Sequence, residues 1–169
     1  GPDEAVPYPS ASDQLDYELE LAAVIGREGN NVADADAFAY IAGFTIFNDW
    51  SCRDLQRDEM EARLGPAKGK DSATSLGPWI VTTDELAPYI RDGRLHVRCT
   101  LKVNGVQWMD NNGGLMYHTW GAMLDQARTE VLEIEKQRSA GVITQGERHN
   151  KIIDIWHRVT EKVSEEMFR

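Results

Sequence analysis

The chain has 169 residues, of which 41% are hydrophobic and 27% charged, enough for one ordinary globular domain or for one domain with a small appendage. Its formal net charge of −10 comes from residues 1–127, where 20 acidic side chains outnumber 10 basic ones, whereas residues 128–169 hold 8 of each. The negative charge of residues 1–127 argues against binding to nucleic acid through the protein's own electrostatic field. The change in composition near residue 127 indicates that the chain has two parts.

Two further properties bear on location. No stretch approaches 18 consecutive apolar residues, so we expect no membrane-spanning helix. The sequence also lacks a basic start followed by an apolar segment, so we expect no secretory signal. Cys52 and Cys99 lie far apart and belong to no paired motif, which is typical of free thiols in a reducing compartment. We therefore expect a cytoplasmic protein.

The first predicted element is a strand over residues 15–25. Apolar residues alternate with carboxylates from Leu15 to Leu21, which is the period of a β-strand. Three carboxylates share one face of this strand: Asp16, Glu18 and Glu20. Because like charges on one face repel, the pattern predicts a positive partner, and the candidate is a divalent cation completed by Asp49.

An apolar run over residues 38–47 predicts a second, buried strand, and the segment 48–56 follows it directly. Residues 54–64 are rich in charge and lack Gly and Pro, which predicts a helix with Ser51 or Asp49 as its N-cap. A carboxylate, an arginine and a glutamine therefore gather where a strand ends and a helix begins.

The middle of the chain is predicted to contain a loop and a hairpin. The loop over residues 64–74 carries Lys70. An Asn-Gly pair at 104–105 separates two alternating segments, residues 95–103 and 106–108. This arrangement predicts a β-hairpin with a two-residue type I′ turn.

From residue 115 onward strand signals stop and apolar residues recur at helical spacing. One such face comprises Met123, Ala127, Val131 and Ile134, and a second comprises Ile152, Ile155, Trp156, Val159 and Val163. Thr144 and Glu147 fit a capping box that opens the second helix. We predict an antiparallel, coiled-coil-like helical hairpin whose first helix runs from about Met116 to Ser139.

The clustered carboxylates have two interpretations. Glu18, Glu20 and Asp49 offer only hard oxygen ligands, which suit Mg²⁺, Mn²⁺ or Ca²⁺ better than Zn²⁺. Spacing alone favours the alternative, in which the acidic residues form the solvated face of an antiparallel strand. Three further side chains share this ambiguity: Arg53, Gln56 and Lys70. They are either surface residues or the binding groups for a carboxylate-bearing substrate.

Five motifs occur in order along the first part of the chain: Leu15–Gly26, Gly43–Gln56, Gly69–Lys70, Leu76–Trp79 and Val103–Gly105. Through them, residues 1–127 resemble the fumarylacetoacetate hydrolase family. Its members bind a divalent metal, which acts as a Lewis acid, and they hydrolyse, decarboxylate or isomerise β-dicarbonyl acids. The resemblance implies that Glu18, Glu20 and Asp49 are metal ligands. It also implies a substrate site of Arg53, Gln56 and Lys70, with Lys70 as the catalytic group that stabilises negative charge.

Residues 128–169 resemble an unrelated protein through Arg128–Gln137 and Ala140–Trp156. They are similar to the helical hairpin at the rim of the secondary channel in the beta-prime subunit of bacterial RNA polymerase. That hairpin docks secondary-channel transcription factors and has no chemistry of its own. The resemblance implies a chimera joined near Ala127–Arg128, with such factors as candidate partners.

Together these observations predict an α+β protein: a truncated mixed β-roll of the fumarylacetoacetate hydrolase type, followed by the helical hairpin. The family's catalytic His and a further metal-binding Asp belong upstream of the motifs found here, so we expect weak metal binding and an impaired or inactive enzyme. The alternative is a non-catalytic folding or interaction scaffold that presents the hairpin. Sheet edges left open by truncation predict a homodimer.

Overall fold

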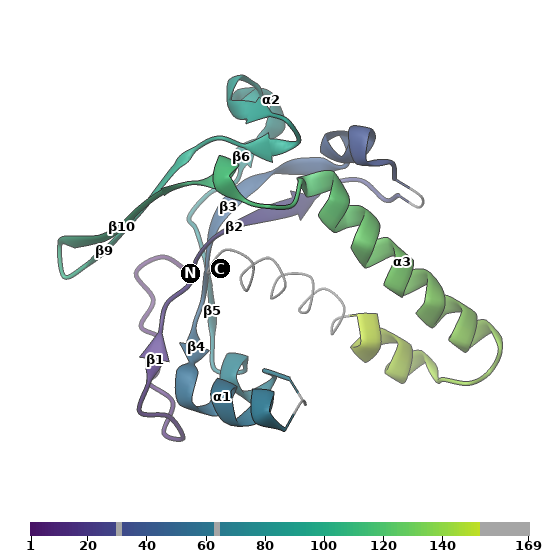
Figure 1. The fold of residues 1–169 in the computed structure, drawn as a ribbon, viewed down its shortest axis with the longest axis horizontal. Helices are drawn as coiled ribbons and strands as arrows, with labels where there is room; N and C mark the ends of the chain where they lie inside the picture. Colours follow the sequence, from purple (N-terminus) through teal and green to yellow (C-terminus); the bar gives the residue numbers. More distant parts are fainter. Residues whose placement is uncertain (30–31, 63–64, 153–169) are drawn as a thin grey trace. The chain divides into compact units, whose positions relative to one another are not determined.

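A computed structural model describes residues 1–29, 32–62 and 65–152, with the backbone alone for residues 126–133. The chain forms two compact units, each assembled from segments that are far apart in sequence (Figure 1). Unit 1 comprises Gly1–Val24, Gly43–Thr83 and Cys99–Asp110. Unit 2 comprises Ile25–Ala42, Asp84–Arg98 and the chain from Asn111 onward.

Short antiparallel sheets alternate with helices along the chain. The strands are β1 (Leu15–Asp16), β2 (Leu19–Ile25), β3 (Ile41–Asp49), β4 (Ser51–Cys52), β5 (Thr74–Leu76), β6 (Val81–Thr82), β7 (Ile90–Arg91), β8 (Arg94–Leu95), β9 (Arg98–Val103) and β10 (Val106–Asn112). Among the described residues, the α-helices are α1 (Arg53–Glu61), α2 (Thr83–Leu86) and α3 (Trp120–Ser139), and residues 145–152 are also helical. The 3₁₀ helices are η1 (Asp34–Ala39), η2 (Lys68–Lys70), η3 (Ala87–Tyr89) and η4 (Gly113–Leu115). This mixture confirms the predicted α+β class.

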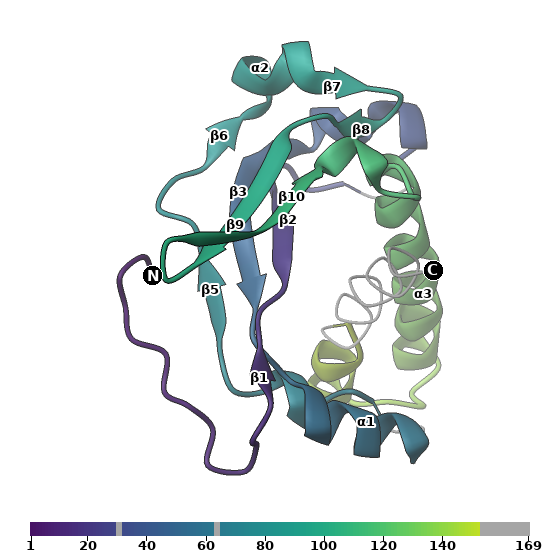
Figure 2. The ribbon, with the colours of Figure 1, turned by 60° about the vertical axis from the view of Figure 1, so that its left-hand side comes forward.

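The largest sheet has the strand order β2-β3-β5, and β6 pairs with β3 as its fourth strand. β3 is antiparallel to both β5 and β6, with Phe47 opposite Leu76 and Phe44 opposite Val81. Three two-stranded sheets complete the part of the fold that the structure describes: β1–β4, β7–β8 and β9–β10. β3 leads through β4, which Figure 1 labels beside α1, directly into that helix, and Figure 2 shows β3 and α1 in a second view. The end of the sheet and the start of the helix therefore lie at one place.

The predicted strand over residues 15–25 is interrupted in the structure, where β1 ends at Asp16 and β2 begins at Leu19. At the break, backbone amides donate to side-chain oxygens in place of sheet hydrogen bonds. The amide of Tyr17 donates to Asp16 Oδ1 (2.9 Å), and the amide of Glu18 donates to Asn48 Oδ1 (3.0 Å). Side-chain acceptors of this kind compete with regular pairing, and their effect is not visible in a pattern of alternating polarity.

The β9–β10 hairpin confirms its prediction. Asn104 and Gly105 both have positive φ, at 51° and 81°, as a type I′ turn requires. β9 starts at Arg98, later than predicted, because Leu95 belongs to β8.

The predicted N-caps of α1 are wrong. The helix begins at Arg53 with Cys52 in the capping position, and no side chain caps it. The hydroxyl of Ser51 instead donates to the carbonyl of Asp49 (3.1 Å), while Ser51 and Cys52 are almost fully buried, at 0% and 1% exposure. Ser51 is therefore a core residue of unit 1, because β4 pairs with β1 immediately before the helix starts.

In unit 2 the side chain of Asp34 connects η1 to the start of α3. η1 has no side-chain cap, and Asp34 instead accepts a hydrogen bond from the hydroxyl of Thr119 (3.2 Å to Oδ1). Thr119 is itself the N-cap of α3, because its Oγ1 accepts from the amide of Ala122 (3.0 Å). A Cβ on Gly121 would lie 1.7 Å from Asp34 Oδ1 and 2.5 Å from the Asp34 carbonyl oxygen. Only a glycine fits this close approach.

α3 runs without a break across the predicted Ala127–Arg128 junction, and it begins at Trp120 rather than Met116. After its turn, residues 145–152 are helical again. The capping box is confirmed, since the amide of Thr144 donates to Glu147 Oε2 (2.7 Å) and the amide of Glu147 donates to Thr144 Oγ1 (3.2 Å).

Side chains join α3 to the segment after its turn. Arg148 Nε donates to Glu135 Oε1 (2.6 Å), and buried Ile134 packs with Met123, Ile143 and Ile152. The remainder of the predicted second helix, including Trp156, Val159 and Val163, lies outside the described residues. The helical hairpin as a whole therefore stays a prediction. In the described part of the chain, no helix combines the length and apolar character needed to cross a bilayer.

Two glycine substitutions test the contact between η1 and α3. We expect Gly121→Ala to lower the free energy of unfolding by roughly 2 kcal/mol or more, because the backbone oxygen of Asp34 blocks the new methyl group. Gly146→Ala is the control: its Cβ would meet nothing within 4 Å, so the helix preference for alanine should leave stability unchanged or up to about 1 kcal/mol higher. Urea unfolding followed by circular dichroism measures both, and equal effects would contradict the close approach.

Candidate metal-binding site

Three carboxylates converge in unit 1 at the point where β1, β2 and the end of β3 meet. Glu18, Glu20 and Asp49 each present an oxygen atom within 4.8 Å of the others. The side chains of Glu18 and Asp49 are each only 12% exposed. Glu18 therefore does not lie on the solvated strand face of the alternative expectation, whereas Asp16, at 45% exposure, remains partly in solvent.

Backbone geometry brings the three carboxylates together. Asp49 is the last residue of β3 and lies opposite Thr74 of β5 in the sheet. Its neighbour Asn48 accepts the amide hydrogen of Glu18 through Oδ1 (3.0 Å), which fixes the chain at the break between β1 and β2. Glu20 follows two residues later on β2. Asn48 is a site-building residue that the sequence alone did not identify.

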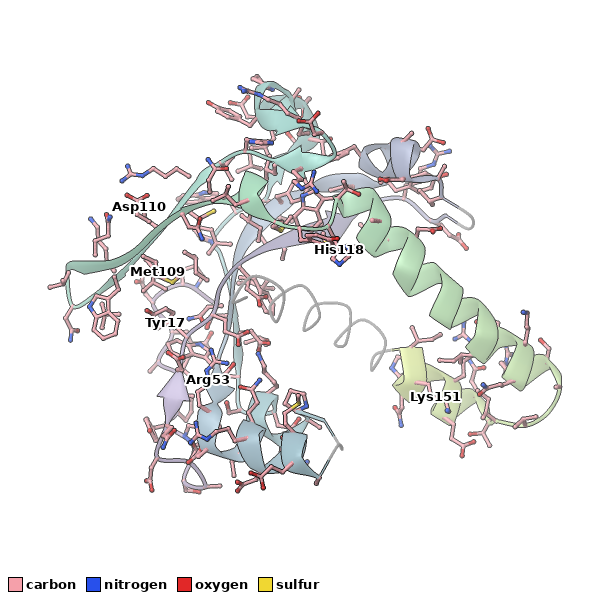
Figure 3. All side chains as sticks on the ribbon, viewed as in Figure 1. Tyr17, Arg53, Met109, Asp110, His118 and Lys151 are labelled. Atoms are coloured by element: carbon pink, nitrogen blue, oxygen red, sulfur yellow. The ribbon has the colours of Figure 1, made fainter. Side chains whose placement is uncertain are left out.

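Arg53 joins the first turn of α1 to the acidic cluster. Its Nε donates to Asp16 Oδ2 (2.9 Å), and its Nη1 donates to Glu18 Oε1 (2.7 Å) and to Gln56 Oε1 (2.9 Å). Figure 3 labels Arg53 at the start of the helix, beside β1. The guanidinium thus neutralises two carboxylates and orients the amide of Gln56 with the same fork.

Lys70 supplies the second positive charge. Its Nζ donates to Glu18 Oε2 (2.6 Å) and to Asp49 Oδ2 (2.9 Å), and its side chain is only 8% exposed. Lys70 is therefore not the surface residue of the alternative expectation. All six predicted site residues lie in one cluster: Glu18, Glu20, Asp49, Arg53, Gln56 and Lys70.

The two cations affect the neighbouring carboxyl groups unequally. Burial raises the pKa of Glu18, but the hydrogen bond and charge of Lys70, followed by those of Arg53, outweigh it and hold the pKa of Glu18 below its usual range. Glu20 shows the opposite result. Burial, and then the charges of Glu18 and Asp49, raise the pKa of Glu20 to about 8. At neutral pH the site without a metal therefore retains a proton on Glu20.

The charge balance of the cluster fits a divalent cation. Fully ionised, it would hold four carboxylates, those of Asp16, Glu18, Glu20 and Asp49, against the two cations Arg53 and Lys70, which leaves two negative charges. The proton that burial, and then the charges of Glu18 and Asp49, hold on Glu20 offsets one of these two negative charges. Three oxygen ligands around a net charge of −2 match the preference of Mg²⁺, Mn²⁺ and Ca²⁺.

Comparison with known proteins gives a consistent result. The family described as "Fumarylacetoacetate (FAA) hydrolase C-terminal" matches residues 1–135, beyond the predicted junction at Ala127–Arg128. A fumarylacetoacetate hydrolase domain-containing protein 2 homolog of Dictyostelium discoideum is 38% identical over 112 residues, covering 63% of this chain and 37% of that protein. The mitochondrial oxaloacetate tautomerase Fahd2a of Rattus norvegicus is 39% identical over 107 residues, covering 62% and 32%.

A solved structure agrees with these matches. The crystal structure of fumarylpyruvate hydrolase from Pseudomonas aeruginosa, in complex with Mn²⁺ and pyruvate, superposes with a TM-score of 0.54 at 27% identity. It covers 62% of this chain and 43% of that one. This chain thus spans about a third of the two curated relatives and less than half of the solved structure.

The proton on Glu20 predicts how stability depends on pH in metal-free buffer. A folded-state pKa of about 8, against 4.5 for the ordinary carboxyl, means that only the folded chain retains this proton between those values. The free energy of unfolding should therefore fall as pH rises from about 5 to about 8. Glu20→Gln should remove this contribution, whereas Glu28→Gln, at an exposed position, should leave it. Urea unfolding at pH 6 and pH 9 with a chelator measures the slope. Equal pH slopes of the free energy of unfolding in the wild type and in Glu20→Gln would contradict the prediction that the proton on Glu20 causes the pH dependence.

Proposed function

From its membership of the fumarylacetoacetate hydrolase family, to which the chain belongs, we propose that it is a divalent-metal-binding protein with hydrolase-, isomerase- or tautomerase-like chemistry on β-dicarbonyl acids. The observation that carries the proposal is the cluster of Glu18, Glu20 and Asp49 with its uncompensated charge. Mn²⁺ is the metal in the related fumarylpyruvate hydrolase, and Mg²⁺ or Ca²⁺ would satisfy the same ligands.

The substrate class follows from the chemistry of the site and of the relatives. The names of two relatives contain oxaloacetate and fumarylpyruvate, both of which carry two carbonyl groups separated by one carbon atom. A bound divalent cation would act as a Lewis acid that polarises a substrate carbonyl. Glu18, Glu20 and Asp49 would hold that cation, and their burial would limit competition by water.

Arg53 and Gln56 are proposed to bind the carboxylate of the substrate. Arg53 already binds two carboxylates of the chain, of which Asp16 is 45% exposed and Glu18 only 12%. An incoming carboxylate would therefore replace Asp16 on the guanidinium fork and leave the bond to Glu18 in place. The amide of Gln56, oriented by Arg53, would then donate to the same ligand.

Lys70 is proposed as the catalytic group. Its ammonium lies between Glu18 and Asp49 and is shielded from solvent, so its charge acts through a medium less polar than water. In this position it would stabilise negative charge that develops on a substrate oxygen. The impaired turnover expected from the sequence stays a prediction, because it concerns groups outside the described site.

Metal-induced stabilisation tests the proposed site. Mn²⁺ or Mg²⁺ at about 100 times its dissociation constant should raise the free energy of unfolding by roughly 2.7 kcal/mol. Glu18→Gln should abolish this metal-induced increment, because it removes a ligand charge, whatever its effect on the metal-free protein. Glu61→Gln, at an exposed position of α1, is the matched control and should retain the increment. Thermal melts with and without metal measure it.

A wild-type chain without any metal-induced shift would favour the second candidate, a non-catalytic scaffold. That candidate rests on the turn after α3, which is closed by the Thr144–Glu147 capping box and by the bond from Arg148 to Glu135. The similarity to the polymerase rim hairpin, the chimeric origin and the docking of transcription factors belong to this candidate as proposals.

We also propose that the chain forms a homodimer through unit 1. Four large apolar side chains near the β3–β5 pairing are exposed: Ile46 (58%), Leu76 (54%), Trp79 (74%) and Ile80 (52%). β5 pairs with β3 on one side only among the described strands, which leaves a sheet edge beside them. An exposed apolar group at an open edge is typical of an interface.

Light scattering coupled to size exclusion tests the dimer. We expect the wild type to elute as a dimer. The dimer dissociation constant of the double variant Trp79→Ser/Ile80→Ser should be about tenfold higher, because the variant buries less apolar area in the interface. Tyr8→Ser removes an aromatic group of similar exposure, 60%, outside the β3–β5 region, and it should leave the dimer intact. A monomeric wild type at micromolar concentration would contradict the proposal.

A further inference from the structure

Lys70 lies at the end of a turn that is bound to α1 by a residue outside the predicted site. Both oxygens of Glu59 accept backbone amide hydrogens of η2: Oε1 from Lys68 (2.7 Å) and Oε2 from Gly69 (2.9 Å). We infer that Glu59 is a positioning residue, which holds this turn against α1 and so fixes the ammonium of Lys70 between Glu18 and Asp49. The inference rests on the role proposed for Lys70 and adds a residue to the same site.

The turn needs an external anchor for two reasons. η2 has only three residues, and its first amides lack partners within a helix, as at the start of any helix. Its own closure consists of two backbone bonds: the amide of Lys70 donates to the carbonyl of Ala67 (3.2 Å), and the amide of Asp71 donates to the carbonyl of Lys68 (3.5 Å). A carboxylate that accepts two such amides forms charge-assisted bonds, which are stronger than neutral ones.

The lysine side chain itself has little intrinsic order. Its four-carbon stem rotates freely about its single bonds, so holding the ammonium at one point costs conformational entropy. The two carboxylates at 2.6 and 2.9 Å hold the distal end, so the proximal end must be fixed as well for the ammonium to occupy one position. Glu59 provides that second fixed point through the backbone immediately before Lys70.

Close packing between η2 and α1 supports the same conclusion. A Cβ on Gly69 would lie 3.0 Å from the amide nitrogen of Gln56 and 3.1 Å from its Cα. The turn therefore lies directly on the helix backbone, at the residue proposed to bind substrate. A glycine at position 69 and a carboxylate at position 59 together determine where Lys70 starts.

One face of α1 then organises the whole site. Arg53, Gln56 and Glu59 are spaced by three residues each, so they follow one another along one side of the helix. The first binds the carboxylates of Asp16 and Glu18, the second bonds to the first, and the third anchors the lysine turn. Functional groups held by a helix in this way keep their relative positions better than groups on free loops.

The chemical accessibility of Lys70 tests the inference without metal or substrate. In the full chain at neutral pH with a chelator, acetic anhydride labels lysines, and peptide mass spectrometry reports Lys70 relative to exposed Lys102. In the wild type Lys70 should be strongly protected, since it is 8% exposed. Glu59→Ala should raise its labelling by about tenfold, as expected when hydrogen bonds that hold a segment are lost.

Glu59→Gln is the conservative variant. It retains one acceptor oxygen of the same shape, so its Lys70 labelling should lie between the wild type and Glu59→Ala. Asp58→Ala, which removes the adjacent exposed carboxylate of the same helix, is the matched control and should leave Lys70 protected. A role of Glu59 in general stability alone would not produce this graded release of one lysine.

Reaction of Cys52 with a thiol reagent monitors the fold in the same samples, because this residue is 1% exposed in the folded chain. If Lys70 becomes reactive while Cys52 stays protected, the inference holds. If both become reactive in Glu59→Ala, that variant has unfolded and Glu59→Gln decides. Lys70 that remains protected in the folded Glu59 variants overturns the inference.

The labelling experiment and the metal-induced stabilisation distinguish failure of this inference from failure of the proposed function. If metal-induced stabilisation is absent but Lys70 is released, the metal-dependent activity is wrong and the positioning role of Glu59 stands. If metal-induced stabilisation is present and Lys70 stays protected in the folded Glu59 variants, the positioning role of Glu59 is wrong and the proposed metal site stands.

Discussion

The ion pairs that link Lys70 and Arg53 to the acidic cluster are the interaction on which unit 1 depends. They join segments far apart in sequence: Lys70 and Glu18 are 52 positions apart, Arg53 and Asp16 are 37, and Lys70 and Asp49 are 21. Carboxylates this shielded from water cost several kcal/mol each unless they are paired. The break between β1 and β2, the end of β3, the start of α1 and the lysine turn are therefore found together because none of these charges is stable alone.

The pattern of the sequence captures features whose causes are local. The Asn-Gly pair at 104–105 and the Thr144–Glu147 box each depend on a few neighbouring residues, and the structure bears out both. The alternating carboxylates at positions 16, 18 and 20 predicted one continuous strand, which the structure interrupts between Asp16 and Leu19. The family resemblance implied what spacing alone could not decide, namely that Glu18, Glu20 and Asp49 belong to one site. The shielding of Glu18 and Asp49 from solvent is seen only in the structure.

The features that the sequence did not predict depend on partners far along the chain. Asp34 looks like a helix cap, but Thr119, 85 positions later, takes its carboxylate. Ser51 looks like another cap until the β1–β4 pairing buries it. Glu59 looks like one of many charges on a solvated helix face, because nothing local shows that two backbone amides of the lysine turn will meet it. No local pattern in a single sequence predicts these contacts, because the tertiary fold determines whether a polar side chain hydrogen-bonds to a neighbour or to a residue far along the chain.

The internal ammonium of Lys70 also has a consequence for the life of the newly made chain. Two carboxylates of the cluster face this ammonium, and burial raises the pKa of the third, Glu20, to about 8. The negative charges of the cluster are thus largely balanced within the polypeptide itself. For the proposed metal-binding protein, folding and metal loading would then be separable events, and the ion would be taken up by a chain that is already folded.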